Sequence, residues 1–288
     1  MNQITIKAYA KINLGLDVLG KRPNGYHDLK MIMQTVNLYD VLTFKKMQEP
    51  GVSLKINFSS LPVNENNLIV KAAKLMMEHY SIKEGVSIEL NKNNPIAAGM
   101  AGGSADAAAT LKAMNQLFEL NASQKELMEL GVTLGADVPY CIMEGTALSE
   151  GIGEILTPLP KIPMCWFVIV KPNVSVSTKF VYQNLVLDET TIHPDIDGIV
   201  TAIKNSDLSG ITSRLENVLE TVTIPKYPRI KEIKHEMLAQ GAIGSLMSGS
   251  GPTVFGIFQS NASAKQCYNY FKQSVSHVQT YLAIPYQP

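Results

Sequence analysis

Cysteine is scarce in this chain of 288 residues, which contains only three, with no C-x-x-C pair among them. An odd number of widely spaced cysteines is not the framework of a disulfide-stapled secreted domain, and it fits a reducing compartment. Free cysteine usually behaves as a small buried hydrophobe. We therefore expect Cys141, Cys165 and Cys267 in the core of a cytoplasmic protein.

An excess of charge of either sign is also missing. The chain carries 25 basic and 25 acidic residues and no long basic run, whereas proteins that bind nucleic acid usually show a basic surface. The apolar run Met164–Val170 is far shorter than the ~20 residues of a membrane helix. The N-terminal residues alternate polar and apolar, unlike a signal peptide. We expect a small-molecule substrate, no nucleic-acid or membrane partner, and a monomer or homodimer.

Two common nucleotide-binding motifs are absent as well. The sequence contains neither G-x-x-x-x-G-K-[ST] nor G-x-G-x-x-G, which are the signatures of P-loop and dinucleotide-binding folds. If the protein binds a nucleotide, it does so with another kind of loop.

The N-terminal segment has the clearest periodicity. Apolar residues occupy every second position from Ile4 to Val18, which predicts a strand, or a bent pair of strands, with one buried face. Lys11 and Asn13 then share the polar face. The following Pro23–Asn24–Gly25 cluster predicts a tight turn, with Tyr26 and His27 just beyond it.

A glycine-rich segment, Pro95–Ala105, runs directly into a helical pattern. Backbone N–H groups can approach an anion closely at glycine, and a helix N-terminus adds free donors and a positive dipole end. We expect Ser104 as the N-cap and Asp106 in the first turn. The segment predicts a phosphate cradle, although a flexible surface loop or tight helix packing would suit it equally.

The rest of the pattern is mixed α/β. We expect a helix after the capping box of Ser123 and Glu126 and a strand-like PYCIM after Asp137. A proline cluster near Leu156–Pro163 predicts a boundary between domains 1–160 and 161–288. The other expected elements are strands at Val41–Phe44, Val52–Phe58, Val86–Leu90 and Trp166–Val170, helices at Leu68–His79 and Arg229–Ala239, and two short strands within Gly241–Phe258.

Lys11 and Asp137 are ambiguous when each is taken alone. A lysine within a half-buried strand is commonly a solvated side chain, and an aspartate after a helix is commonly a turn residue. Tyr26 and His27 could be ordinary turn residues.

Four segments in fixed order resemble the GHMP kinases, the family that includes galactokinase, homoserine kinase and mevalonate kinase. They are AYAKINLGLDVLGKRPNGYH, PIAAGMAGGSADAA, GADVP and LMSGSGPTVFG. The resemblance spans Lys7 to Phe258. It implies a two-domain α/β (α+β) fold, with an N-terminal domain like domain 2 of ribosomal protein S5 and a ferredoxin-like C-terminal domain.

The same resemblance implies an activity and a set of site residues. The reaction would transfer the ATP γ-phosphate to the 2-hydroxyl of a cytidine diphosphate-linked methylerythritol, an isoprenoid precursor. Asp137 would act as base or orienter, with Lys11 as its electrostatic partner. Asn13, Tyr26, His27 and Thr178 would bind this substrate. The implied ATP-binding residues are Asn67, Lys92, Pro95, Ile96, Ala97, Ala98, Gly99, Met100, Ala101, Gly102, Gly103, Ser104 and Ala105.

The glycine loop departs from the family pattern GLGGGSSDAA. Ala101 carries a Cβ, so we expect its φ to be negative. Ala105 replaces a serine of the family pattern, so no hydroxyl is available at this position to hold Mg²⁺. The metal ion is still expected with ATP, because phosphate chemistry needs charge neutralisation, but its ligands are left open. We expect Ser248–Gly251 to support the site more than to act chemically.

Two alternatives remain open. The chain could be a GHMP kinase for another small alcohol, which would not need Tyr26 and His27 for base stacking. It could also be a non-catalytic nucleotide-binding protein of the same fold, which would not need Lys11 and Asp137.

Overall fold

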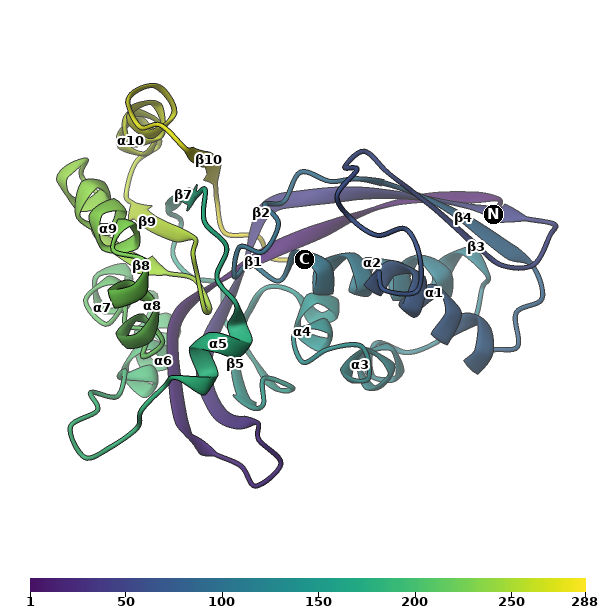
Figure 1. Ribbon diagram of the computed structural model, residues 1–288, viewed down its shortest axis with the longest axis horizontal. Coiled ribbons are helices and arrows are strands. Elements are labelled where there is room, and N and C mark those ends of the chain that lie inside the picture. Colours follow the sequence, from purple (N-terminus) through teal and green to yellow (C-terminus); the bar gives the residue numbers. More distant parts are fainter. The chain divides into compact units, whose positions relative to one another are not determined.

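A computed structural model describes residues 1–288. The chain divides into two compact units that interleave along the sequence (Figure 1), each with helices and strands. A single division near residue 160 differs from this pattern, and the predicted domain boundary stays a prediction. The first unit comprises Met1–Ala10, Leu38–Asn94 and Ala101–Glu144, and the second comprises Lys11–Asn37, Pro95–Met100 and Gly145–Pro288.

Two long paired strands, β1 (Gln3–Lys21) and β2 (His27–Met47), contribute residues to both units. The predicted turn joins them, with Gly25 at φ 87° and the Arg22 N–H donating to the Tyr26 carbonyl at 2.7 Å. The prediction that β1 has one buried and one polar face fails for residues 11–18, because all of them are buried. A Cβ at Gly15 would lie 2.7 Å from Ile199, so α6 (Ile196–Lys204) packs against this strand.

The first unit packs helices against a sheet. In this sheet β3 pairs in parallel with β4, and β4 pairs antiparallel with the Val41–Met47 part of β2. Helix α1 connects β3 to β4 and lies beside α2 (Figure 1). The expected α1, β4 and Ser123–Glu126 capping box are confirmed. These elements are β3 (Val52–Ile56), α1 (Leu68–His79), β4 (Gly85–Asn91), α2 (Gly102–Leu117), α3 (Gln124–Val132) and α4 (Val138–Met143).

The strand-like interpretation of PYCIM is wrong, because this segment lies in α4. All its residues but Met143 are buried, so it shows no helical face, and a short apolar run does not distinguish a strand from a buried helix. Pro139 in the first turn is compatible with a helix, where its missing N–H costs nothing.

The second unit contains an antiparallel sheet of order β10-β7-β9-β8, which α9 and α10 contact. Its succession β7-α9-β8-β9-α10-β10 is the βαββαβ pattern of ferredoxin-like folds. Separately, β5 (Thr146–Gly151) pairs with β2 and β6 (Ile155–Leu159) pairs with β5. The sheet and its helices are β7 (Trp166–Pro172), β8 (Gly244–Met247), β9 (Val254–Phe258), β10 (Val278–Ala283), α9 (Arg229–Ala239) and α10 (Asn261–Ser274).

Several predictions for the second unit are confirmed. They are the strand at Trp166–Val170, the helix at Arg229–Ala239 and the two strands within Gly241–Phe258. All three cysteines of the chain are buried, as expected. None of the helices combines the length and apolarity needed to cross a bilayer. The second unit also contains four short helices, which are α5 (Thr178–Gln183), α6, α7 (Leu208–Thr212) and α8 (Glu220–Lys226).

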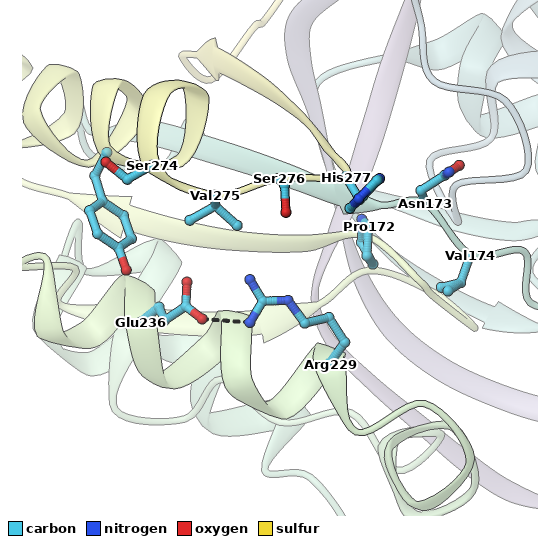
Figure 2. A pocket seen from close by; sticks show the side chains of 10 residues that line it. Pro172, Asn173, Val174, Arg229, Glu236, Ser274, Val275, Ser276 and His277 are labelled. Atoms are coloured by element: carbon cyan, nitrogen blue, oxygen red, sulfur yellow. Dashed lines mark hydrogen bonds and ion pairs between the residues drawn. The ribbon is translucent and has the colours of Figure 1, made fainter.

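A pocket of about 500 Å³ lies in the second unit between α9, α10 and the end of β7 (Figure 2). Arg229 on its wall donates to Glu232 at 2.9 Å and to Glu236 at 2.6 Å. Two carboxylates already offset this guanidinium, so the pocket is poorly suited to a phosphate group. None of the predicted site residues lines this pocket.

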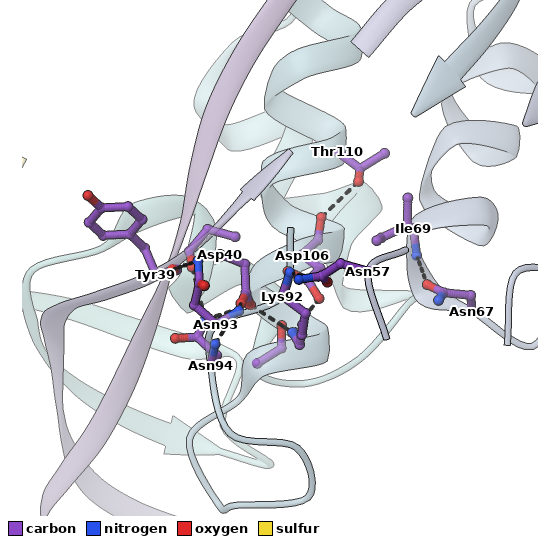
Figure 3. A network of polar contacts seen from close by, with 12 residues as sticks. Tyr39, Asp40, Asn57, Asn67, Ile69, Lys92, Asn93, Asn94, Asp106 and Thr110 are labelled. Carbon is purple, nitrogen blue, oxygen red and sulfur yellow. Dashed lines mark hydrogen bonds and ion pairs between the residues drawn. The ribbon is translucent and has the colours of Figure 1, made fainter. Parts of the chain in front are cut away.

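A buried ionic network fastens α2 to the sheet of the first unit (Figure 3). Lys92, just beyond β4, donates from Nζ to Asp40 of β2 at 2.7 Å and to Asp106 of α2 at 2.6 Å. Asp40 also accepts the backbone N–H groups of Asn93 at 2.6 Å and Asn94 at 2.7 Å. The network therefore joins three elements through one ammonium group.

Asp106 is incompletely hydrogen bonded within this network. Its Oδ1 is buried without a hydrogen-bond partner, and burial raises the pKa of its carboxyl to about 8, against the lowering effect of Lys92. Near neutral pH the carboxyl keeps its proton, so that Asp40, Lys92 and Asp106 together are close to neutral. An isolated buried charge is thereby avoided.

This network predicts a pH-dependent stability. Because the folded-state pKa of Asp106 lies above its unfolded value, the protein takes up a proton on folding between about pH 4 and pH 8. The free energy of unfolding from this group therefore falls as pH rises through that window. Asp106→Asn mimics the protonated carboxyl. Between about pH 6 and pH 8 its stability relative to wild type should increase by about 2 kcal/mol, measured by urea unfolding.

Glu129→Gln, at an exposed carboxylate of α3, is the control and should leave the pH profile unchanged. Parallel profiles for Asp106→Asn and wild type would contradict the assignment of a bound proton to Asp106.

Candidate active site

The glycine-rich segment enters α2 through a left-handed residue. Helix α2 begins at Gly102, and its N-cap is Ala101 with φ 55°. The expected N-cap at Ser104 and the expected negative φ at Ala101 are therefore both wrong. Asp106 lies beyond the first turn, in the network with Lys92. The helix starts three residues earlier than composition suggested, because the left-handed Ala101 turns the chain into the helix axis. This conformation costs of order 1 kcal/mol outside glycine.

The N-terminus of α2 leaves its donors available. Ala101 provides no side-chain cap, and the first turn contains no acidic residue. The first N–H groups of a helix have no intrahelical acceptors, and they stand at the positive end of the dipole. This 16-residue helix thus presents the arrangement that favours a bound phosphate.

The other end of the glycine loop belongs to the second unit and rests on the segment Ser248–Gly251. Gly99 has φ 70°, and a Cβ there would lie 2.3 Å from the Ser248 carbonyl oxygen and 3.0 Å from that of Gly251. Ser248 Oγ also donates to the Gly99 carbonyl at 2.9 Å. Only glycine fits this position, and Ser248–Gly251 supports the loop as expected.

Lys11 and Asn13 form a buried pair on β1. Lys11 is 4% exposed, and its Nζ donates to Asn13 Oδ1 at 2.7 Å. The Lys11 N–H donates to the carbonyl of Met100 in the glycine loop at 3.2 Å. The reading of Lys11 as a solvated strand lysine is therefore excluded, and its strand is attached to the loop by a backbone hydrogen bond.

An aromatic group lies just after the turn between β1 and β2. Tyr26 is 58% exposed, and the ring of His27 is 5.2 Å from that of Tyr182 on α5, tilted by 36°. Burial, with a smaller contribution from Lys21, lowers the pKa of His27. The neutral imidazole has one donor and one acceptor, which suits the edge of a nucleobase.

Thr178 is the first residue of α5, and its hydroxyl is hydrogen bonded to that of Ser250 at 2.9 Å. The structure thus brings this predicted substrate residue to the segment that also supports Gly99.

The remaining predicted residues lie in the first unit. Asp137 precedes α4, and its carboxylate does not cap that helix. Asn67 caps α1 by accepting the Ile69 N–H at 2.9 Å. Lys92 has its ammonium engaged by two carboxylates. Contacts of Asn67 and Lys92 with ATP stay predictions.

Three supporting residues were missed from the sequence. Asn217, Glu220 and Thr223 are spaced three apart, and each hydrogen bonds to the backbone of Met247–Ser250. For Glu220 and Thr223 the available signal was their spacing of three, because residues three apart share one face of a helix, whereas Asn217 precedes α8.

The chain offers no ready-made metal centre. No group of three or more histidine, cysteine, aspartate or glutamate side chains is arranged to hold a metal ion. Mg²⁺ commonly takes most of its ligands from bound phosphates and water.

Two family models match parts of this chain, and named relatives match nearly all of it. The family model "GHMP kinases N terminal domain" matches residues 67–145, and the model "GHMP kinases C terminal" matches residues 196–277. A protein of Lachnoclostridium phytofermentans named 4-diphosphocytidyl-2-C-methyl-D-erythritol kinase is 56% identical over 98% of this chain and 97% of its own length. A protein of Lachnospira eligens with the same name is 54% identical over the full length of both chains.

Solved structures share the fold of this chain. A crystal structure of 4-(cytidine 5'-diphospho)-2C-methyl-D-erythritol kinase covers 99% of this chain and 100% of its own, with a TM-score of 0.85 and 30% identity. Homoserine kinase from Cytophaga hutchinsonii shares the fold, with a TM-score of 0.81 at 22% identity over 99% of this chain and 95% of its own. The chain is therefore a phosphotransferase with a two-domain α/β fold, and it belongs to the GHMP kinase family.

Proposed function

We propose that this protein transfers the γ-phosphate of ATP to the 2-hydroxyl of 4-diphosphocytidyl-2-C-methyl-D-erythritol. The observation that carries the proposal is the identity of 56% over nearly the whole chain with a kinase named for this substrate. The aromatic group of Tyr26, His27 and Tyr182 supports it, because an acceptor that contains cytosine needs a stacking surface and a hydrogen-bonding edge.

The phosphates of ATP bind at the glycine loop in this proposal. The uncapped N-terminus of α2 donates N–H groups to them, and the loop keeps its shape because Gly99 is seated on Ser248–Gly251. Mg²⁺ bound with the nucleotide would neutralise phosphate charge.

The acceptor hydroxyl is tertiary and a poor nucleophile. We assign Asp137 to receive its proton as the oxygen forms a bond to the γ-phosphorus and the bond to ADP breaks. Lys11 offsets negative charge on the transferring phosphoryl group. Phosphoryl transfer depends on position and electrostatics more than on covalent chemistry, and the buried Lys11–Asn13 pair fixes its ammonium.

The substrate assignment is tested with a panel of acceptors. Purified protein is incubated with Mg-ATP and, separately, the cytidyl substrate, homoserine, mevalonate and galactose, and ADP release is measured. We expect turnover with the cytidyl substrate alone. Turnover with another alcohol, or none with any, would refute the proposal.

Asp137→Asn should lower kcat by at least about 100-fold while ATP still binds, because the loop is unchanged. Steady-state kinetics and calorimetric titration with ATP measure the two effects. A variant that keeps wild-type kcat would remove Asp137 from the mechanism. Lys11→Met, which keeps the length of the side chain, should also reduce kcat strongly.

Tyr26→Ala and His27→Ala should raise KM for the cytidyl substrate by about tenfold, because a lost stacking or hydrogen-bonding contact costs about 1–2 kcal/mol. KM for ATP should change by less than about twofold. Equal changes in both KM values would argue against cytosine binding at this aromatic group.

Gly99→Ala should weaken ATP binding by about tenfold or more, because the new Cβ would collide with the Ser248 carbonyl and because φ is positive. Gly20→Ala is the matched control, since a Cβ there meets nothing within 4 Å. Equal ATP affinity in the two variants would contradict the proposed role of the loop.

A further inference from the structure

The side-chain amide of Asn217 is hydrogen bonded to three backbone groups. Its Nδ2 donates to the carbonyls of Met247 at 2.9 Å and Gly249 at 2.8 Å, and its Oδ1 accepts the Leu219 N–H at 3.0 Å. The side chain is buried, with 3% of its residue exposed. An asparagine amide has two N–H donors and one carbonyl oxygen, so both donors and the acceptor are engaged.

The two carbonyls held by Asn217 flank Ser248. The Ser248 N–H donates to Thr253 at 2.9 Å, and its Oγ donates to the Gly99 carbonyl at 2.9 Å. Gly99 contacts the same segment so closely that no side chain fits. The position of Gly99 is therefore set by a segment that Asn217 holds through two of its carbonyls.

The chain on either side of Asn217 is also hydrogen bonded to β1. The Leu16 N–H donates to the Glu216 carbonyl at 3.0 Å, and the Val218 N–H donates to the Leu16 carbonyl at 3.0 Å. Leu16 lies on the strand that carries Lys11 and Asn13. One short segment, Glu216–Val218, thus fixes both that strand and the support of the glycine loop.

We propose that Asn217 is a positioning residue for nucleotide binding, which acts through Ser248 to place Gly99 of the phosphate loop. The proposal rests on the proposed function only in taking this loop as the phosphate site. Glu220, which accepts the Met247 N–H at 2.9 Å, and Thr223, which donates to the Ser250 carbonyl at 3.3 Å, hold the same segment at further points. Asn217 alone holds the carbonyls on both sides of Ser248.

The first experiment measures ATP binding without any acceptor substrate. Asn217→Ala and the milder Asn217→Ser are titrated with ATP by calorimetry, and their Tm values are recorded. We expect Kd to rise by about tenfold in Asn217→Ala, because two hydrogen bonds that place the loop are lost, and by less in Asn217→Ser, which keeps one possible donor.

The control for a merely structural role is Asn115→Ala. Asn115 also bridges a loop, by donating to the Ala122 carbonyl and accepting the Ala122 N–H, both at 2.9 Å. Its loss should lower Tm and leave the Kd for ATP within about twofold. If Asn217→Ala behaves in the same way, the proposal is overturned.

The second experiment is a double-mutant cycle with Ser248→Ala, which removes the contact to Gly99 and also stands alone if the Asn217 variants do not fold. We expect Ser248→Ala to weaken ATP binding, and the double variant to bind no more weakly than the worse single variant, since both act on one path. Additive losses, or wild-type affinity in Ser248→Ala, would refute the path through Ser248.

The outcomes also separate this inference from the proposed function. ATP binding with no turnover of the cytidyl substrate would refute only the proposed function. A wild-type protein that does not bind ATP would overturn both.

Discussion

The close approach of Gly99 to the backbone of Ser248–Gly251 is the constraint on which the proposed site depends. Two backbones meet there at a distance that excludes even a methyl group, so the glycine loop cannot shift without separating from its support. The same loop is hydrogen bonded to β1 through Met100 and Lys11. Phosphate-binding loops need such support, because backbone donors stabilise an anion best when they are held in place before it binds.

Two lysines with buried side chains, Lys92 and Lys11, show how the partners of a charge separate a structural role from a chemical one. Lys92 is enclosed by two carboxylates, which raise its pKa against the effect of burial, and its charge is used to fasten α2 to the sheet. Lys11 is equally buried but donates to the neutral amide of Asn13. A neutral partner orients an ammonium group without cancelling its field, which suits a residue that is to act on a phosphoryl group.

Most strands and helices could be predicted from periodicity and capping, as with α1, α9 and the Ser123–Glu126 capping box. Predictions failed where local signals were silent or misleading. Ala101 adopts a left-handed conformation that alanine usually avoids, so its residue type did not predict it. PYCIM is almost entirely buried and therefore shows no helical alternation of polar and apolar residues. The burial of Lys11 depends on segments distant in sequence. Asn217 was missed because its partners are backbone carbonyls, which leave no trace in the residue types around them.

The interleaved order of the two units has a consequence for how the chain matures on the ribosome. The first unit ends at Glu144, so all of its residues have been made when half of the protein is still to be synthesised. The strands Lys11–Asn37 belong to the second unit, whose remaining residues follow Gly145. These apolar strands emerge early and must wait for partners made later, and exposed strands of this kind are the ones that chaperones protect in growing chains.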